Sequence, residues 1–315
     1  MQPLDWLLES DPAIRWQTLR DLTDASPAAL AAERARVPRE GLVAAILALQ
    51  QSDGAWRRPG APAWLTTLFT MQLLRATGVD TRDPAVDAAL ARAEVNLRWS
   101  DHDGWDLRSP DFGGNPFFEG EVEPCINGGV LAFGAYFGRP NENLVRRLLS
   151  EQLEDGGWNC EAPDSRRSSF HTTICVLEGL LEYEHAVRSA PDVARARRRG
   201  EEYLLERALL RRLSTGEVAN SEFLELAFPP RYHYDILRAL DYFRAGGGPP
   251  DPRMCDAVAF IRSRRHEDGR WLLDRAYDEA LPLPPTESAG EPSRWNTLRA
   301  LRVLRWYETS TPPSP

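Results

Sequence analysis

One short turn, made of an acidic residue, glycine, any residue and tryptophan, occurs three times and constrains the fold more than any other feature of the chain. The copies are QQSDGAW ending at Trp56, EQLEDGGW ending at Trp158 and RRHEDGRW ending at Trp271, and DHDGW at Trp105 is a shortened copy. Each copy follows an amphipathic run with apolar residues three and four positions apart. A loop and a second, more apolar run come after it. The repeating unit is therefore predicted to be helix, turn, helix.

The more apolar helices of these units define the expected architecture. Aligned by their apolar pattern, they give six segments, which start at Trp16, Leu65, Cys125, His171, His233 and Trp295. Six more polar runs pair with them, and helix pairs that cannot bury their apolar faces alone must stack on neighbouring pairs. Six pairs can close a ring with the apolar helices inside. We therefore predict an all-α fold, a single six-fold α/α toroid over residues 1–308, with a disordered tail at 309–315.

Charge and composition exclude several kinds of partner. The net charge is -9, and all 38 basic residues are arginines scattered along the chain, which argues against nucleic acid. No apolar run approaches the roughly 20 residues that span a bilayer, and MQPLDWLLES lacks the basic residues of a secretion signal. We expect a cytoplasmic protein with no integral membrane segment. Its four cysteines are expected to be thiols.

Thiol and imidazole side chains are predicted to meet at one end of the ring. Cys125, His171 and His233 open three consecutive apolar helices, and Cys160 lies in the loop that leads to His171. Zinc prefers cysteine sulfur and histidine nitrogen in a tetrahedral arrangement. We therefore predict a Zn²⁺ site with the ligands Cys125, Cys160, His171 and His233. Three ligands would leave a position open for a thiol or water and four would close the site, and the same residues also fit a plain role in satisfying backbone groups at helix starts.

Cationic and aromatic side chains next to the apolar helices are candidates for substrate binding. Guanidinium groups just before these helices suit an anion such as a diphosphate, and aromatic rings on or beside them suit an apolar ligand. The candidates are Arg166, Arg167, Arg231, Tyr232, Tyr234, Arg294, Trp64 and Trp295. The expected ligand is an apolar or isoprenoid small molecule. The sequence identifies neither a catalytic residue nor a protein partner.

The repeat turns resemble those of a known superfamily. The glutamine-to-tryptophan spacing, from Gln51 to Trp56 and one residue longer from Gln152 to Trp158, is similar to that of the prenyltransferase and squalene-cyclase (terpenoid cyclase) superfamily. The resemblance covers essentially the whole chain. It implies the six-fold α/α toroid and chemistry on isoprenoid substrates.

The same resemblance bears on the metal site. The segment FHTTICVLEGL around His171 is similar to one that carries a zinc histidine in the protein prenyltransferase β-subunit. Cys125 matches the cysteine region of that family, whereas EPCINGG lacks its neighbouring aspartate ligand. Cys160 and His233 are then the natural replacements.

These observations favour an enzyme over a binding protein. The expected reaction is alkyl transfer from an isoprenoid to a metal-activated thiol, because the chain lacks the Asp-x-Asp-Asp acid that the family uses for squalene-type cyclisation. Two alternatives stay open. One is a noncatalytic lipid- or peptide-binding toroid with structural zinc, and the other is thiol chemistry like that of lanthionine cyclases.

Overall fold

The computed structural model describes residues 1–99, 114–277 and 280–310, and these residues are mainly helical. They form thirteen α-helices and two strands of two residues each, so the predicted all-α class is confirmed. Within them, no helix has both the length and the apolar character that crossing a bilayer requires. The described residues divide into two compact parts. Unit 1 is residues 1–34, 202–277 and 285–310, and unit 2 is residues 35–99, 114–201 and 280–284.

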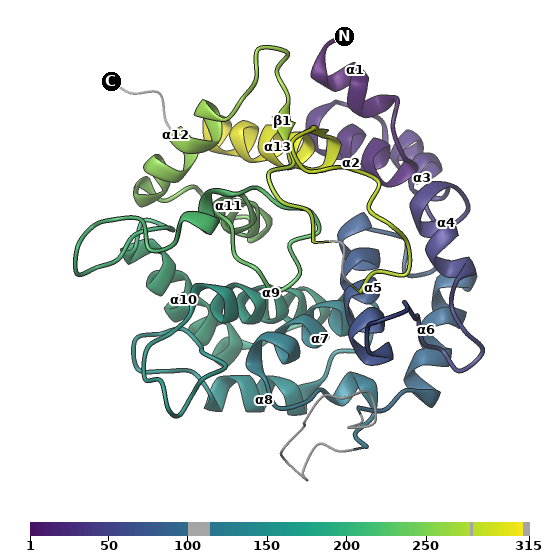
Figure 1. The fold of residues 1–315 in the computed structure, drawn as a ribbon, viewed down its shortest axis with the longest axis horizontal. Coiled ribbons are helices and arrows are strands. Elements are labelled where there is room, and N and C mark those ends of the chain that lie inside the picture. Colours follow the sequence, from purple (N-terminus) through teal and green to yellow (C-terminus); the bar gives the residue numbers. More distant parts are fainter. Residues whose placement is uncertain (100–113, 278–279, 311–315) are drawn as a thin grey trace. The chain divides into compact units, whose positions relative to one another are not determined.

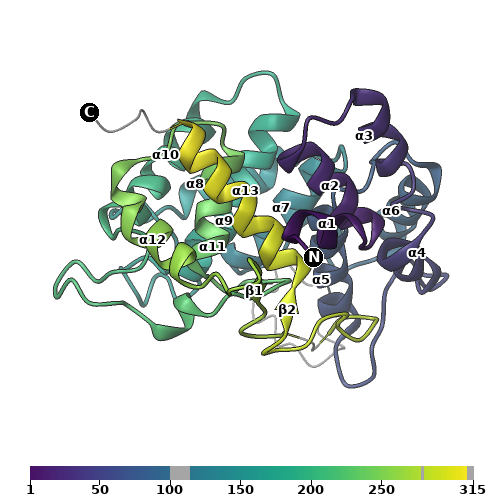
Figure 2. The ribbon, with the colours of Figure 1, turned by 90° about the horizontal axis from the view of Figure 1, so that it is seen from above.

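Unit 1 is built around helix α13, which packs against both α2 and α11 (Figures 1 and 2). Strands β1 and β2 pair antiparallel just before α13, with Trp271 opposite Ser293. The elements of unit 1 are α1 (Pro3–Leu8), α2 (Pro12–Leu22), α3 (Pro27–Arg34), the 3-10 helices η3 (Ser221–Leu224) and η4 (Pro252–Met254), α11 (Ile236–Ala245), α12 (Cys255–Ser263), β1 (Trp271–Leu272), β2 (Pro292–Ser293) and α13 (Arg294–Ser310).

Unit 2 has the corresponding arrangement around helix α7, which packs against α5 and α9 (Figure 1). Its elements are α4 (Gly41–Ala48), α5 (Ala63–Thr77), α6 (Pro84–Asn96), the 3-10 helix η2 (Phe117–Glu119), α7 (Pro124–Tyr136), α8 (Glu142–Ser150), α9 (Phe170–Ala186) and residues 191–201 of α10 (Pro191–Glu206). The buried side chains of α5, α7 and α9 are predominantly apolar and supply much of its core.

The six apolar segments found in the sequence correspond to α2, α5, α7, α9, α11 and α13. The start of α11 was predicted wrongly, because this helix begins at Ile236, with Asp235 as its N-cap, and not at His233. Helix α13 continues to Ser310, two residues past the predicted boundary at 308, and the remainder of the predicted tail lies outside the described residues. The closed six-fold ring and the single domain stay predictions.

The repeat turns act as structural ties between helices. In each of the three full copies the tryptophan indole N–H donates to a backbone carbonyl ten residues earlier, over 2.7 Å. That carbonyl belongs to the last turn of the preceding helix, where backbone acceptors lack helical partners. The three pairs are Trp56 with Ile46, Trp158 with Leu148 and Trp271 with Ile261. The shortened copy at Trp105 lies outside the described residues.

A threonine from the following apolar helix completes each tie. Its hydroxyl accepts a hydrogen bond from the backbone N–H of the tryptophan, over 3.0 to 3.1 Å. These threonines are Thr67 on α5, Thr173 on α9 and Thr297 on α13, all fully buried. Each turn therefore joins the helix before it to the helix after it.

The glutamine of the turns differs from the one proposed from the sequence. Gln50, and not Gln51, donates to the carbonyls of Gly54 and Ala89. Gln152 makes the equivalent bonds to Gly156 and Ala196. Since Gln50 precedes Trp56 by the same six positions that separate Gln152 from Trp158, the two turns have equal lengths.

Helices α7 and α9 approach each other closely enough for backbone contact. A Cβ atom added to Gly128 on α7 would lie 2.5 Å from the Cys175 carbonyl oxygen. One added to Gly179 on α9 would lie 2.5 Å from the Gly128 carbonyl oxygen. Both distances are far below a van der Waals contact, so these two positions require glycine.

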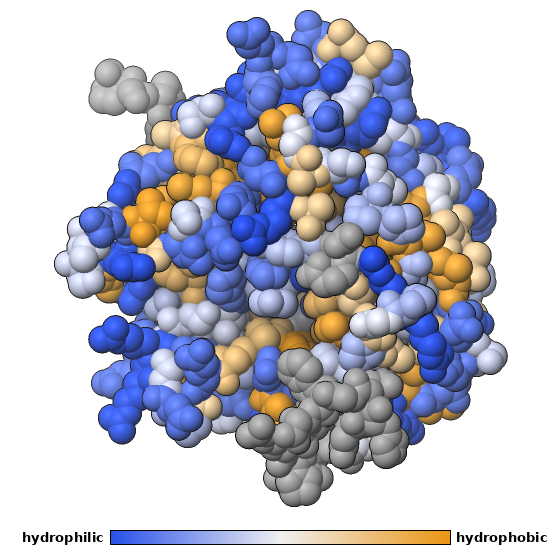
Figure 3. All heavy atoms as spheres, in the orientation of Figure 1, coloured by the Kyte–Doolittle hydropathy of each residue, from blue (hydrophilic) through white to orange (hydrophobic). Residues whose placement is uncertain are grey.

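Most large apolar side chains of the described residues lie in the cores, and hydrophilic residues predominate on the face shown in Figure 3. Among residues 1–99, 114–277 and 280–310, the exposed large apolar side chains are Met1, Leu49, Val95, Leu213 and Tyr232.

We expect Trp158→Phe to lower the free energy of unfolding by roughly 1–3 kcal/mol, because the Leu148 carbonyl loses its donor in a buried site. Urea denaturation of the full chain measures the change. Trp306→Phe is the control, since its indole donates to the Gly248 carbonyl at a more exposed position. Equal effects of the two substitutions would show that the buried turn bond has no special weight.

We expect Gly128→Ala to destabilise the chain by roughly 1–3 kcal/mol, because the new methyl group meets fixed backbone. Gly129→Ala is the matched control, since its Cβ would meet the end of the Gln72 side chain, which can move. Thermal denaturation of both variants tests the prediction, which fails if Gly128→Ala is no less stable than Gly129→Ala.

Candidate functional site

Three potential metal ligands converge at the start of helix α7 in unit 2. One ligand atom each from Glu123, Cys125 and Cys160 lies within 4.8 Å of the other two. Glu123 is the N-cap residue of α7, Cys125 lies in its first turn, and Cys160 follows the repeat turn that ends at Trp158. All three side chains are half-buried. Two sulfur atoms and one carboxylate oxygen therefore share one small volume.

The segment before α7 is held in place by a buried carboxylate and an amide. The Glu121 carboxylate accepts hydrogen bonds from the backbone N–H groups of Val122 and Glu123, and burial raises its pKa to about 7. The Asn127 side chain bonds both the N–H and the carbonyl of Glu121, each over 2.8 Å. Pro124 follows at the first position of the helix, where no backbone N–H is needed, so the chain enters α7 directly after Glu123.

Cys160 is positioned by the loop that connects the repeat turn to helix α9. The Asn159 side-chain amide donates to the Arg167 carbonyl over 2.7 Å, and this bond holds the two ends of the loop together. The Cys160 sulfur lies 3.4 Å from the hydroxyl oxygen of Thr172, in the first turn of α9. The position of the Cys160 sulfur is therefore set by two features, the repeat turn at Trp158 and the start of α9.

The two thiols have different acidities. The hydrogen bond from the Cys125 thiol, with a further one from the Thr172 hydroxyl, lowers the pKa of Cys160 although burial opposes this. The same thiol contact, followed by burial, raises the pKa of Cys125, whose sulfur also lies 3.5 Å from a carboxylate oxygen of Glu123. Of the pair, Cys160 is therefore the one that more readily becomes a thiolate.

Of the four predicted zinc ligands, Cys125 and Cys160 are the two that the structure groups within unit 2. His171 is not part of the three-residue group, because Thr172 faces Cys160 and successive helix residues point about 100° apart. His233 belongs to unit 1 and lies before α11. Its ring stacks on Tyr277 at a centroid distance of 3.9 Å and on Tyr232 at 4.0 Å.

Glu123 was missed from the sequence, although a signal for it was present. A carboxylate two residues before Cys125 is visible in EPCINGG, but the ligand that the resemblance implies there is an aspartate. The side chain of glutamate is one methylene longer and supplies the same carboxylate donor. The two remaining cysteines are outside the group, since Cys175 is buried on α9 and Cys255 is exposed on α12.

The four predicted arginines do not share one environment. Arg166 and Arg167 are exposed in the loop before α9 of unit 2. In unit 1, Arg231 is buried, has a φ of 54° in the left-handed region, and donates to the Tyr277 carbonyl. The Arg294 guanidinium lies 4.4 Å from the centroid of the Trp6 ring. Arg231 and Arg294 thus have structural contacts of their own.

Three of the four predicted aromatic residues are packed in cores. Trp64 is 5.5 Å from Trp99 between ring centroids, and Trp295 stacks on Phe228 at 4.3 Å. The Tyr234 hydroxyl donates to the Leu209 carbonyl over 2.5 Å in a fully buried position. Tyr232, with 47% of its surface exposed, is the member that solvent reaches readily.

No protein-family model and no curated protein matches the chain. Among solved structures it is similar to the type II terpene cyclase MstE from Scytonema, with 16% identity, a TM-score of 0.49, and coverage of 95% of this chain and 88% of that one. An arginine-to-alanine variant of that enzyme, in complex with its substrate geranylgeranyl dihydroxybenzoate, gives 16% identity, the same TM-score, and coverage of 95% and 87%.

We expect iodoacetamide to modify Cys160 faster than Cys125 in metal-free protein, because the thiolate is the reacting form. Thr172→Val removes one hydrogen bond to Cys160 and is expected to slow its reaction roughly twofold to tenfold. Mass spectrometry of timed samples measures each rate. The rate at exposed Cys255 is the internal control, and faster modification of Cys125 would contradict the assignment.

Proposed function

We propose that this chain is an enzyme of the terpenoid-cyclase and prenyltransferase type that binds zinc at Glu123, Cys125 and Cys160 and acts on an isoprenoid or similarly apolar substrate. The observation that carries the proposal is the convergence of these three ligand atoms within 4.8 Å. The group combines two thiols and a carboxylate in half-buried surroundings, and all three are ligand types that zinc accepts. It supports a site for a cation.

The donor set fits zinc better than other common metal ions. Thiolate sulfur selects zinc and copper(I) or iron–sulfur clusters, while magnesium and calcium require oxygen ligands almost exclusively. Zinc also accepts a carboxylate beside cysteine, in tetrahedral coordination. Three protein ligands leave one position, which is the pattern of catalytic zinc sites. The proposed site is therefore a catalytic one.

When bound, zinc would lower the pKa of a thiol or water in the remaining position and hold it as a nucleophile. The residues of the chain have separate tasks. Cys125 and Glu123 are fixed by the start of α7, and Thr172 orients the Cys160 sulfur through its hydroxyl. The bonds of Asn127 to the Glu121 backbone keep the approach to α7 rigid.

The proposed reaction is alkylation of a thiol by an isoprenoid electrophile. A carbon–sulfur bond forms while the bond from carbon to the leaving group breaks, the leaving group takes the electron pair, and the thiol proton passes to solvent. The isoprenoid class rests on the resemblance of the repeat turns and of the His171 segment to the superfamily. The absence of an Asp-x-Asp-Asp segment from the sequence disfavours cyclisation started by a strong acid.

A structural zinc site in a noncatalytic binding protein is the second candidate. It would require a fourth ligand, and His171, half-buried on α9 near Thr172, is the natural one to examine. Metal analysis of His171→Ala therefore separates the two candidates. Retention of zinc favours three ligands and an open position, while its loss favours a closed site.

The proposal is tested by metal analysis of untagged protein purified without chelator or added metal. We expect close to one zinc per chain, and a loss of most of it in both Cys125→Ser and Cys160→Ser. Cobalt substitution supplies a second readout, because sulfur coordination gives a charge-transfer absorption that each variant should weaken.

Cys255→Ser is the control, since this exposed thiol on α12 is outside the three-residue group. It should keep its zinc. The proposal is wrong if folded wild-type protein contains no zinc and takes up none on reconstitution, or if Cys255→Ser loses as much as the other two variants.

A further inference from the structure

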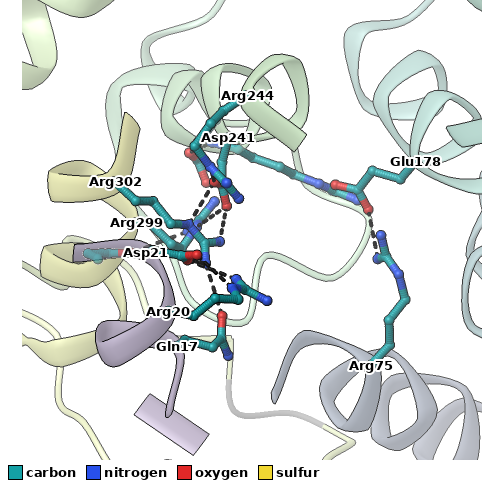
Figure 4. Close-up of polar contacts among 12 residues, drawn as sticks. Gln17, Arg20, Asp21, Arg75, Glu178, Asp241, Arg244, Arg299 and Arg302 are labelled. Atoms are coloured by element: carbon teal, nitrogen blue, oxygen red, sulfur yellow. Dashed lines mark hydrogen bonds and ion pairs between the residues drawn. The ribbon is translucent and has the colours of Figure 1, made fainter. Parts of the chain in front are cut away.

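Unit 1 contains a group of charged side chains from helices α2, α11 and α13, which we name the arginine cluster (Figure 4). Its members touch one another through hydrogen bonds and ion pairs. The arginine cluster consists of Arg20, Arg244, Arg299 and Arg302 together with Asp21 and Asp241. The proposed zinc site uses none of these residues.

Arg302 is the centre of the arginine cluster. Its Nε donates to Asp241 over 2.8 Å, and its Nη1 lies 2.9 Å from the Gln17 side-chain oxygen and 3.3 Å from Asp21. Arg244 donates to Asp241 through Nε over 2.8 Å. Two carboxylates thus tie the three helices together.

The arginine cluster carries more positive than negative charge. Four guanidinium groups stand against two carboxylates, and their ion pairs within the described residues go to these same two acids. Arginine keeps its proton in proteins. Although burial opposes this, the surrounding guanidinium groups hold the pKa of Asp21 and of Asp241 below the usual value, so both acids are ionised at neutral pH. The surplus of two positive charges therefore persists.

Two of the four guanidinium groups that carry this positive charge are accessible to solvent. The side chains of Arg299 and Arg302 are 5% and 12% exposed, whereas those of Arg244 and Arg20 are 21% and 41% exposed. Figure 4 shows Arg244 and Arg20 on either side of Arg302. Within the described residues, Arg244 uses only its Nε, so both of its terminal nitrogens keep their hydrogen-bonding capacity.

The two accessible guanidinium groups are also held in place. Arg20 bonds Asp21 through two nitrogens, over 2.6 and 2.8 Å, and lies 4.5 Å from the centroid of the Trp16 ring. Arg244 is fixed by its bond to Asp241. Ion pairing and stacking already restrict these side chains. Binding a ligand therefore costs the two arginines little further side-chain entropy.

We propose that the arginine cluster is a binding site for a doubly charged oxyanion, with inorganic phosphate as the simplest example. Arg244 and Arg20 contact the anion, and Arg302 positions them through the two carboxylates. A phosphate matches the surplus of two charges and the paired N–H groups of guanidinium, which bind tetrahedral oxyanions with two hydrogen bonds. The site goes beyond the proposed function and holds or fails independently of the zinc site.

The test is titration of the full chain with sodium phosphate at constant ionic strength, followed by isothermal calorimetry and by thermal denaturation. We expect saturable binding with a rise in melting temperature. Arg244→Gln should weaken phosphate binding about tenfold, as expected when charge-assisted hydrogen bonds are lost. Arg20→Gln should weaken it in the same direction.

Arg262→Gln is the matched control, because this arginine of α12 forms an ion pair with Glu308 at 48% exposure and is outside the arginine cluster. Its phosphate affinity should equal that of the wild type. Sodium acetate is the control anion, and its single charge should give little response. The proposal is overturned if acetate acts like phosphate, if wild-type protein shows no saturable response, or if Arg262→Gln loses as much affinity as Arg244→Gln.

Discussion

Each unit depends on a buried indole N–H that donates to the carbonyl ten residues before it. At Trp158 this bond reaches Leu148 at the end of α8, and the backbone N–H of the same tryptophan donates to the hydroxyl of Thr173 on α9. A helix end has unpaired carbonyls, and a buried one must find a donor. The tryptophan supplies that donor together with a large apolar ring, so one residue ends a helix and fills the core beneath it.

The repeat turns position reactive side chains as well as helices. Cys160 stands two residues after Trp158, so the turn that joins α8 to α9 also delivers a thiol to the start of α9. Cys125 reaches the same place because α7 packs backbone to backbone against α9 through Gly128 and Gly179. A larger distance between these two helices would move the two sulfur atoms apart. The donor group is thus a consequence of one turn and one close helix contact.

The two units concentrate opposite kinds of polar chemistry. Unit 2 gathers two thiols and a carboxylate, which suit a cation, while unit 1 gathers guanidinium groups in excess over carboxylates, which suit an anion. In each case a group with a strong contact positions a more accessible one: Thr172 supports Cys160, and Arg302 supports Arg244 through Asp241. Buried polar groups of this kind are costly unless paired, which explains why their partners are well defined.

The sequence by itself determined the helical class and the repeat turns with their tryptophans. These follow from patterns that are short along the chain, namely apolar periodicity and a glycine and a tryptophan at a fixed spacing after each helix. The tertiary structure alone decided which neighbours complete the site. It added Glu123, left His171 outside the three-residue group of unit 2, and joined arginines of three helices around Asp241. Such groupings depend on helix phase and on packing between segments far apart in the chain, where an error of one residue turns a side chain by about 100°.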